Sequence, residues 1–131
     1  ASKHPWGDAK TPFEALGGDA GVKRLAWAFY DVVEETSPVL TAMLPADTTE
    51  SRQKLYEFLS GWAGGPPLYW ERRGHPALRM RHAPFPIDRH AADEWARCME
   101  TALERAGVGG DALRFFSTEL GRVARQLQNR T

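Results

Sequence analysis

The sequence lacks three features that would point to particular classes of protein. Cys98 is its one cysteine, which excludes an internal disulfide framework and every CxxC motif of a zinc knuckle. The 17 basic and 17 acidic side chains balance, so we expect neither a nucleic acid nor an anionic membrane surface as a partner. No stretch approaches the ~20 consecutive apolar residues that span a bilayer. These absences favour a reducing, cytoplasmic setting.

Common catalytic motifs are also missing. The sequence contains no GxSxG, GxxxxGKS/T or HExxH pattern, and no pair of carboxylates in an apolar context. The glycine pairs at residues 17–18 and 64–65 lack the flanking strands that a phosphate-binding loop needs, so we interpret them as helix ends. None of the enzyme classes that these motifs mark is expected.

The chain has enough hydrophobic residues for one packed domain. It has 131 residues, of which 42% are hydrophobic, a size and composition typical of a single core. Residues 1–10 carry Pro5, Gly7 and scattered charges. We expect them to form a flexible lead-in to a domain of residues 11–131.

Apolar residues recur at helical spacing, and we find no convincing alternating strand pattern. A first long helix is expected from Ala20, with Asp19 as its cap and a stripe of Val22, Leu25, Ala26, Phe29, Tyr30 and Val33. Residues 47–50 form a capping box for a second helix, which residues 64–67 terminate. The stripe of the second helix is Ser51, Leu55, Phe58, Leu59 and Trp62.

The second half of the chain predicts further helices around a loose middle section. Residues 68–74 are expected to be irregular, and a short helix over residues 76–82 should stop before Pro84, because proline disfavours helical geometry in the preceding residue. A longer helix is expected from Asp88 to about Gly107. A last helix carries Phe116, Leu120, Val123 and Leu127. The pattern predicts an all-α domain.

His82 is the candidate metal ligand. It closes the short helix in the irregular region, and long irregular connections are more often functional than decorative. By position alone, a histidine near a helix C-terminus is more often a surface or capping residue. His75 competes for the role, but it precedes the helix, where a turn contact is expected. His90 lies at an exposed helix start and His4 in the polar lead-in, so both rank below His82.

Tyr30 and Trp95 are the polar groups on the apolar stripes. Each could be a large core residue whose hydroxyl or indole N–H finds a backbone partner. In a dry pocket, the same two groups would be donors to a bound ligand that carries partial negative charge. The spacing permits either interpretation.

The run GHPALRMRHAPFPI at residues 74–87, with Phe29-Tyr30 before it and residues 95–99 (WARCM) after it, resembles the group II truncated haemoglobins. The opening PFEALGG and the GGP turn at residues 64–66 also fit, and the resemblance covers roughly residues 11–128. It implies a two-over-two helical sandwich around non-covalently bound haem b. His82 matches the proximal iron ligand, Tyr30 the distal tyrosine, and Trp95 the tryptophan that marks group II.

The resemblance also implies contacts with the rest of the cofactor. Lys54, Arg79 and Arg81 match positions that tend to lie near the haem propionates, and Phe58 and Phe85 are expected against the apolar ring.

The distal side departs from the family at one place. The family usually has an aromatic residue or a histidine in the link before the second helix, where this sequence has Leu44, or Met43 if the loop differs by one residue. Neither side chain can donate a hydrogen bond. Ser51 and Leu55 are expected nearby, with Ser51 contributing weakly or through water, so the ligand would depend mainly on Tyr30 and Trp95.

Three functions compete. The first is reversible binding of small diatomic ligands such as oxygen, nitric oxide, carbon monoxide or cyanide. The second is nitric oxide dioxygenation or peroxidase-like turnover, which needs a reductase or an oxidant that the sequence does not name. The third is a haem-free helical interaction module. In each case we expect a monomer or weak homodimer.

Overall fold

Helices make up all of the regular structure in the described part of the chain. The computed structural model describes residues 2–131, and within these residues it contains eight helices and no strand. The helices are α1 (Pro12–Ala15), α2 (Gly18–Thr36), α3 (Pro38–Thr41), α4 (Thr49–Trp62), α5 (Leu68–Arg73), α6 (Leu78–His82), α7 (Arg89–Arg105) and α8 (Gly110–Gln126). The all-α prediction is confirmed.

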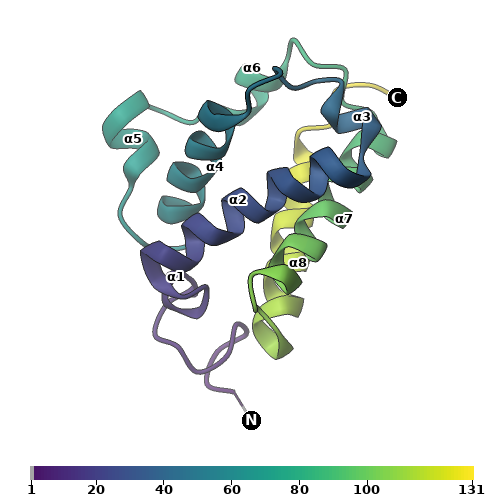
Figure 1. Ribbon diagram of the computed structural model, residues 1–131. Helices are drawn as coiled ribbons and strands as arrows, with labels where there is room; N and C mark the ends of the chain where they lie inside the picture. Colours follow the sequence, from purple (N-terminus) through teal and green to yellow (C-terminus); the bar gives the residue numbers. More distant parts are fainter. Residues whose placement is uncertain (1) are drawn as a thin grey trace.

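Two pairs of long helices form the frame of the fold (Figure 1). Helices α7 and α8 lie antiparallel and have the most extensive contact in the molecule. Helix α2 crosses α7 on one side and packs against α4 on the other. The result is two helices over two, as predicted, with α5 and α6 at the edge beyond α4 (Figure 1).

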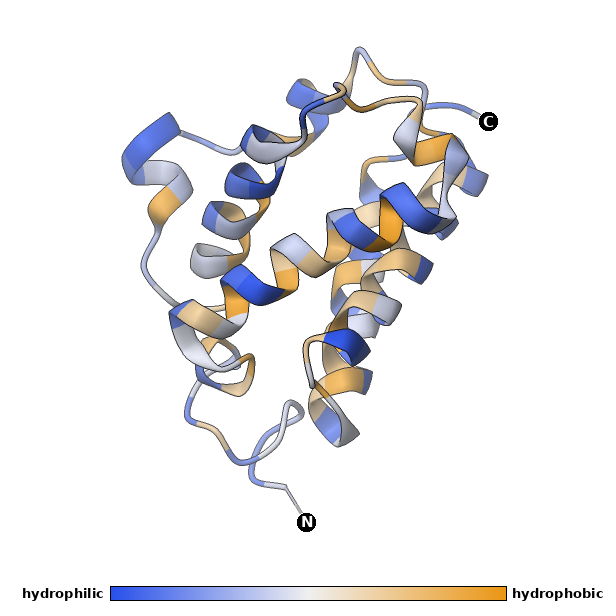
Figure 2. Ribbon diagram, in the orientation of Figure 1, coloured by the Kyte–Doolittle hydropathy of each residue, from blue (hydrophilic) through white to orange (hydrophobic). Residues whose placement is uncertain are grey.

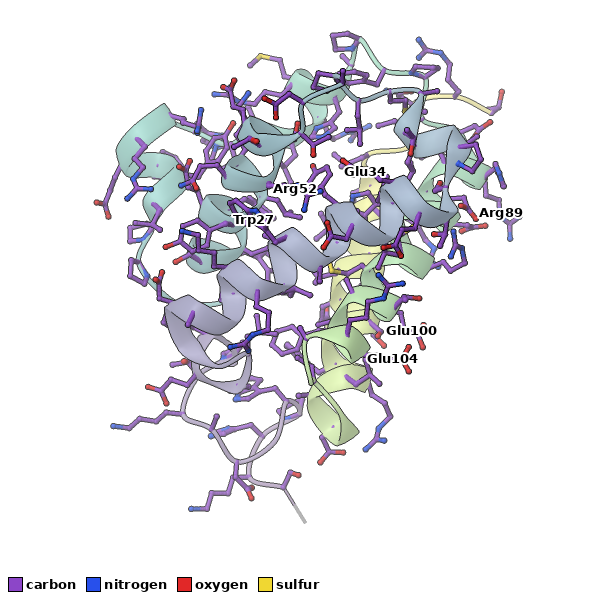
Figure 3. All side chains as sticks on the ribbon, viewed as in Figure 1. Trp27, Glu34, Arg52, Arg89, Glu100 and Glu104 are labelled. Carbon is purple, nitrogen blue, oxygen red and sulfur yellow. The ribbon has the colours of Figure 1, made fainter. Side chains whose placement is uncertain are left out.

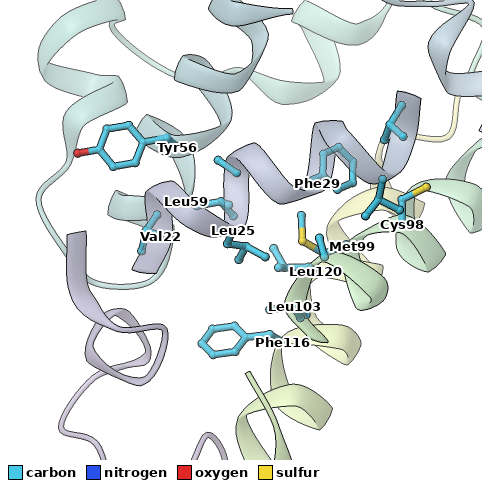
Figure 4. Packing of buried hydrophobic residues seen from close by; sticks show 14 of the residues in the cluster. Val22, Leu25, Phe29, Tyr56, Leu59, Cys98, Met99, Leu103, Phe116 and Leu120 are labelled. Atoms are coloured by element: carbon cyan, nitrogen blue, oxygen red, sulfur yellow. The ribbon is translucent and has the colours of Figure 1, made fainter. Parts of the chain in front are cut away.

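The buried faces of the long helices meet in one apolar core (Figure 4). Its fully buried side chains include Leu25, Phe29, Leu59, Cys98, Met99, Leu103, Phe116 and Leu120. Each long helix also carries hydrophilic residues on its other side (Figure 2). Burial raises the pKa of the Cys98 thiol, so Cys98 acts here as a small core residue rather than a reactive one.

Local caps explain where several helices begin. The Thr11 hydroxyl accepts a hydrogen bond from the backbone N–H of Glu14, and Asp88 accepts one from Ala91; both are standard N-cap contacts. At the other end of α4, Gly65 is required by close packing. A Cβ atom there would lie 2.3 Å from the ring of Phe13, so the predicted glycine turn has a steric cause.

Two predicted caps do not form as expected. Helix α2 begins at Gly18, and the Asp19 carboxylate accepts a hydrogen bond from the Tyr56 hydroxyl instead of capping the helix. The capping box at residues 47–50 forms only in part: the Asp47 carboxylate accepts a hydrogen bond from the backbone N–H of Thr49 at 2.9 Å, one residue short of the predicted Glu50. The Glu50 side chain does not return to cap the helix start and lies near Lys54 and Arg73, at 3.5 and 3.6 Å.

Residues 68–73, predicted to be irregular, form α5. Tyr69 is buried, and Arg72 and Arg73 both pair with the carboxylate of Glu57, which is 2% exposed. This helix is held by its contacts with α4, which a six-residue sequence pattern cannot reveal.

The N-terminal segment contacts the helical domain. Trp6 packs edge-on against Phe115 of α8 with 5.4 Å between ring centroids, while the division into residues 1–10 and 11–131 stays a prediction. None of the helices within residues 2–131 is both long and apolar enough to cross a membrane.

Candidate functional site

Two adjoining pockets lie among α2, α4, α6, α7 and α8. Their interiors hold about 130 and 440 Å³, and the larger falls within the size range of organic-ligand pockets. Five residues line both pockets: Tyr30, Leu44, His82, Trp95 and Leu127. We call this continuous space the central cavity. It brings together the three residues that the sequence singled out most strongly.

His82 is the last residue of α6 and lines both parts of the central cavity. Its Nδ1 lies 2.7 Å from the carbonyl oxygen of Leu78. Because a carbonyl can only accept a hydrogen bond, Nδ1 is the donor, and in the neutral imidazole Nε2 then keeps a free lone pair. The imidazole is therefore oriented by its own helix and has one nitrogen free to bind a metal.

The loop after His82 is tied to the C-terminal tail. The Asn129 side-chain amide donates to the carbonyl of Phe85 at 3.0 Å and to that of His82 at 3.4 Å. Its oxygen accepts from the backbone N–H of Ile87 at 2.9 Å. Pro84 and Pro86 have no N–H to contribute to a local turn, so the tail supplies the contacts that hold this loop.

Tyr30 and Trp95 come from different helices, α2 and α7, and both pack against the ring of Phe29, with centroids 5.1 and 5.0 Å from it. Within residues 2–131, neither the Tyr30 hydroxyl nor the Trp95 indole N–H has a hydrogen-bond partner in the protein, and neither is sealed in the core. Two free donors therefore face the central cavity.

Arg52 lies behind Tyr30 and was not singled out by the sequence. Figure 3 shows it on α4, directed towards the part of α2 that carries Trp27 and Glu34. Its guanidinium lies 5.9 Å from the centre of the Tyr30 ring. Burial raises the pKa of Tyr30 to about 12, and the charge of Arg52 acts in the opposite direction. The phenol is therefore neutral, and its environment is set partly by a cation.

The remaining distal candidates line the central cavity. Leu44 lines both of its parts and Met43 lines one, so the apolar character expected there is present. Ser51, Leu55 and Phe58 of α4 line the larger part.

The three predicted cations fall in different places. Lys54 lines the larger part of the cavity and lies 3.5 Å from Glu50. Arg81 lines it too, but donates to the carbonyl of His75 at 3.0 Å. Arg79 is exposed and lines neither part. Phe85 lines the smaller part.

The competing histidines lie outside the central cavity. His75 accepts a hydrogen bond at Nδ1 from the backbone N–H of Ala77 at 2.8 Å, which is the turn contact expected of it. His90 and His4 line neither part.

Several lining residues were missed as site residues. Val33, Val123 and Leu127 were assigned to helical stripes, and Ile87 closes the GHPALRMRHAPFPI run. Their apolar spacing could not separate cavity lining from core, because both need the same helix face.

Comparison with known proteins agrees with this geometry. A family model described as bacterial-like globin matches residues 11–128. The group 2 truncated hemoglobin YjbI of Bacillus subtilis (strain 168) is 41% identical over 120 residues, which cover 92% of this chain and 89% of that protein.

Solved structures give the same result. The group II truncated hemoglobin of Bacillus anthracis is 40% identical with a TM-score of 0.89, covering 93% of this chain and 98% of that one. A truncated haemoglobin of Bacillus subtilis is 40% identical with a TM-score of 0.84, covering 92% of this chain and 100% of that one. The chain therefore belongs to the bacterial-like globin family, and within it to the group II truncated haemoglobins.

Proposed function

We propose that this chain binds haem b non-covalently through His82 and reversibly binds oxygen and other small diatomic ligands beside Tyr30 and Trp95. Membership in the truncated haemoglobins implies haem-based ligand binding, and the individual residues are our assignment. One observation carries the proposal: an imidazole with a free Nε2 and two unpartnered donors line the same cavity.

The residues of the central cavity fit a haem. Within residues 2–131, no three His, Cys, Asp or Glu side chains come together to hold a metal ion, and a lone imidazole suits an iron whose other ligands belong to a macrocycle. Phe58 and Phe85 supply apolar surface for the ring, and Lys54 and Arg81 are cations at the cavity edge for its carboxylates. Arg79 would have to turn inward to join them. When bound, haem supplies the iron to which small diatomic ligands attach.

Tyr30 and Trp95 would stabilise the ligand by donating hydrogen bonds to it. Leu44 and Met43 keep their part of the cavity apolar and offer no donor. Tyr30 and Trp95 therefore carry the polar contribution, and Ser51 adds a weak or water-mediated one. The Bacillus subtilis protein with a similar structure is described as oxygen-avid. Two donors in a mainly apolar pocket support slow oxygen release here too.

Oxygen dissociation rates of the haem-loaded protein test this role. Each lost hydrogen bond is worth about 1 kcal/mol or more, so Tyr30→Phe and Trp95→Phe should each release oxygen at least about fivefold faster than wild type. Stopped-flow displacement of oxygen measures the rate.

Matched controls exist in the same chain. Tyr56→Phe removes a hydroxyl that bonds to Asp19, and Trp62→Phe alters a tryptophan that packs near Phe116; neither residue lines the central cavity. Both controls should keep the wild-type rate. Equal rates in Tyr30→Phe, Trp95→Phe and their controls would remove the two donors from the ligand site.

Redox chemistry stays a prediction. Nitric oxide dioxygenation or peroxidase-like turnover requires a reductase or oxidant, and catalytic turnover of nitric oxide with a generic reductase would distinguish an enzyme from a carrier that reacts once. The family assignment favours haem binding over the haem-free interaction module. The cytoplasmic location and the monomer or weak homodimer also stay predictions.

A further inference from the structure

Arg52 is the most completely engaged charged side chain beside the central cavity. Its side chain is 11% exposed and lies between α4 and α2. Nη1 donates to the carbonyl of Trp27 and to Asp31, both at 2.8 Å, and Nε donates to the Thr48 hydroxyl at 3.0 Å. Nη2 lies 3.4 Å from Glu34. The guanidinium is thus fixed by partners on α2 and by Thr48 at the start of its own helix.

These partners hold the guanidinium beside the Tyr30 ring. Trp27, Asp31 and Glu34 precede and follow Tyr30 on α2 by three, one and four residues, so they hold Arg52 against the helical turn that carries the phenol. The guanidinium carbon lies 5.9 Å from the ring centre, within the range of a cation–π contact. A fixed cation beside a desolvated phenol favours polarisation of its O–H bond.

We propose that Arg52 is a positioning residue for Tyr30: it holds the ring in place and strengthens the hydroxyl as a hydrogen-bond donor to the ligand. This inference rests on the proposed function, because Tyr30 must serve a bound ligand. Arg52 itself does not line the cavity, so its effect passes through Tyr30.

A double-mutant cycle on the haem-loaded protein tests the inference. Arg52→Met keeps the length of the side chain and removes its charge, and Asp31 and Glu34 are 55% and 43% exposed, so water can take over their solvation. We expect Arg52→Met to release oxygen roughly threefold to tenfold faster. The C–O stretching frequency of the carbon monoxide complex should rise as the donor weakens. In a Tyr30→Phe background, Arg52→Met should change neither quantity, because the hydroxyl is already gone.

Two further variants separate a positioning effect from a general loss of stability. Arg52→Lys keeps the charge without the fork of donors and should recover part of the wild-type rate. Arg105→Met breaks another arginine contact with α2, to Glu35 at 2.8 Å; neither residue lines the cavity, so this variant should leave the rate unchanged. An equal effect of Arg52→Met with and without the Tyr30 hydroxyl, or no effect in either, overturns the inference.

Wild-type protein that takes up no haemin overturns the proposed function as well, whereas wild-type protein that binds haemin but shows no Arg52 effect overturns this inference alone.

Discussion

At the scale of single residues, Ala77 adopts a backbone conformation that its side chain disfavours. It has φ +42° at the N-terminus of α6, where its N–H donates to His75 and its carbonyl accepts from the backbone of Arg81 at 2.9 Å. The left-handed region costs an alanine roughly 1–2 kcal/mol relative to glycine. This strain lies five residues before His82, within the turn that starts its helix.

Replacing Ala77 with glycine should therefore stabilise the fold. Part of the relief is offset by the greater freedom of glycine in the unfolded chain, so we expect a gain of about 0.5–1 kcal/mol in the free energy of unfolding, measured by urea denaturation. Ala83→Gly is the matched control, because Ala83 has φ −53° and glycine should destabilise it. A loss in both variants would contradict strain at Ala77.

Tyr30 and Arg52 mark how far single residues could be predicted. Tyr30 stands on a helical stripe whose spacing permitted either a core or a ligand-facing role, and the resemblance to a known family assigned it to the distal side. Arg52 is a charged residue on a mixed helix face, and its partners Asp31 and Glu34 lie on a helix about 20 residues away. Only the packing of α4 on α2 brings these groups together, and no local pattern carries that information.

At the scale of elements, Glu57 fastens α5 to α4. Its buried carboxylate accepts hydrogen bonds from Arg73 Nε at 2.6 Å, from Gln53 at 3.0 Å and from Arg72 at 3.3 Å. Burial raises the pKa of this carboxyl, but the three hydrogen bonds outweigh burial and hold the pKa below its ordinary value. The carboxylate is therefore charged when folded, and it anchors the segment that leads to α6.

We expect Glu57→Gln to lower the free energy of unfolding at neutral pH by about 1–3 kcal/mol, because two arginines lose a charged partner. The pKa of Glu57 is lower in the folded protein than its ordinary value of 4.5. The extra free energy of unfolding of the wild type is therefore present above pH 4.5 and is lost as the pH falls through the folded pKa. Urea denaturation of both proteins at several pH values measures this. A gap between them that stays constant down to about pH 3 would show that the charge of Glu57 does not stabilise the fold.

Helix α5 shows why sequence patterns failed to predict a short element. The long helices α2, α4, α7 and α8 carry several turns of apolar spacing, so their existence was predictable. Helix α5 has six residues and one buried side chain, Tyr69, which is too little for a periodic signal. The capping box at residues 47–50 formed only in part, because the Glu50 side chain found Lys54 and Arg73 as partners.

At the scale of the whole molecule, the crossing of the helix pairs brings the cavity residues together. Phe29 packs between Tyr30 of α2 and Trp95 of α7, and His82 reaches the same space from α6. The residue types and the two-over-two arrangement were predicted through the resemblance to a known family. The cavity lining by Ile87, Val33 and Leu127 came only from the packed structure, because those side chains are indistinguishable from core in the sequence.

The most direct test of the account is haemin titration of the purified protein and two histidine variants. Wild type and His75→Ala should each bind about one equivalent of haemin with an intense Soret band, since His75 only makes a turn contact. In His82→Ala the ferrous protein should lose the iron–histidine band in its resonance Raman spectrum, and added imidazole should restore it. A wild-type iron–histidine band in His82→Ala would contradict iron ligation by His82.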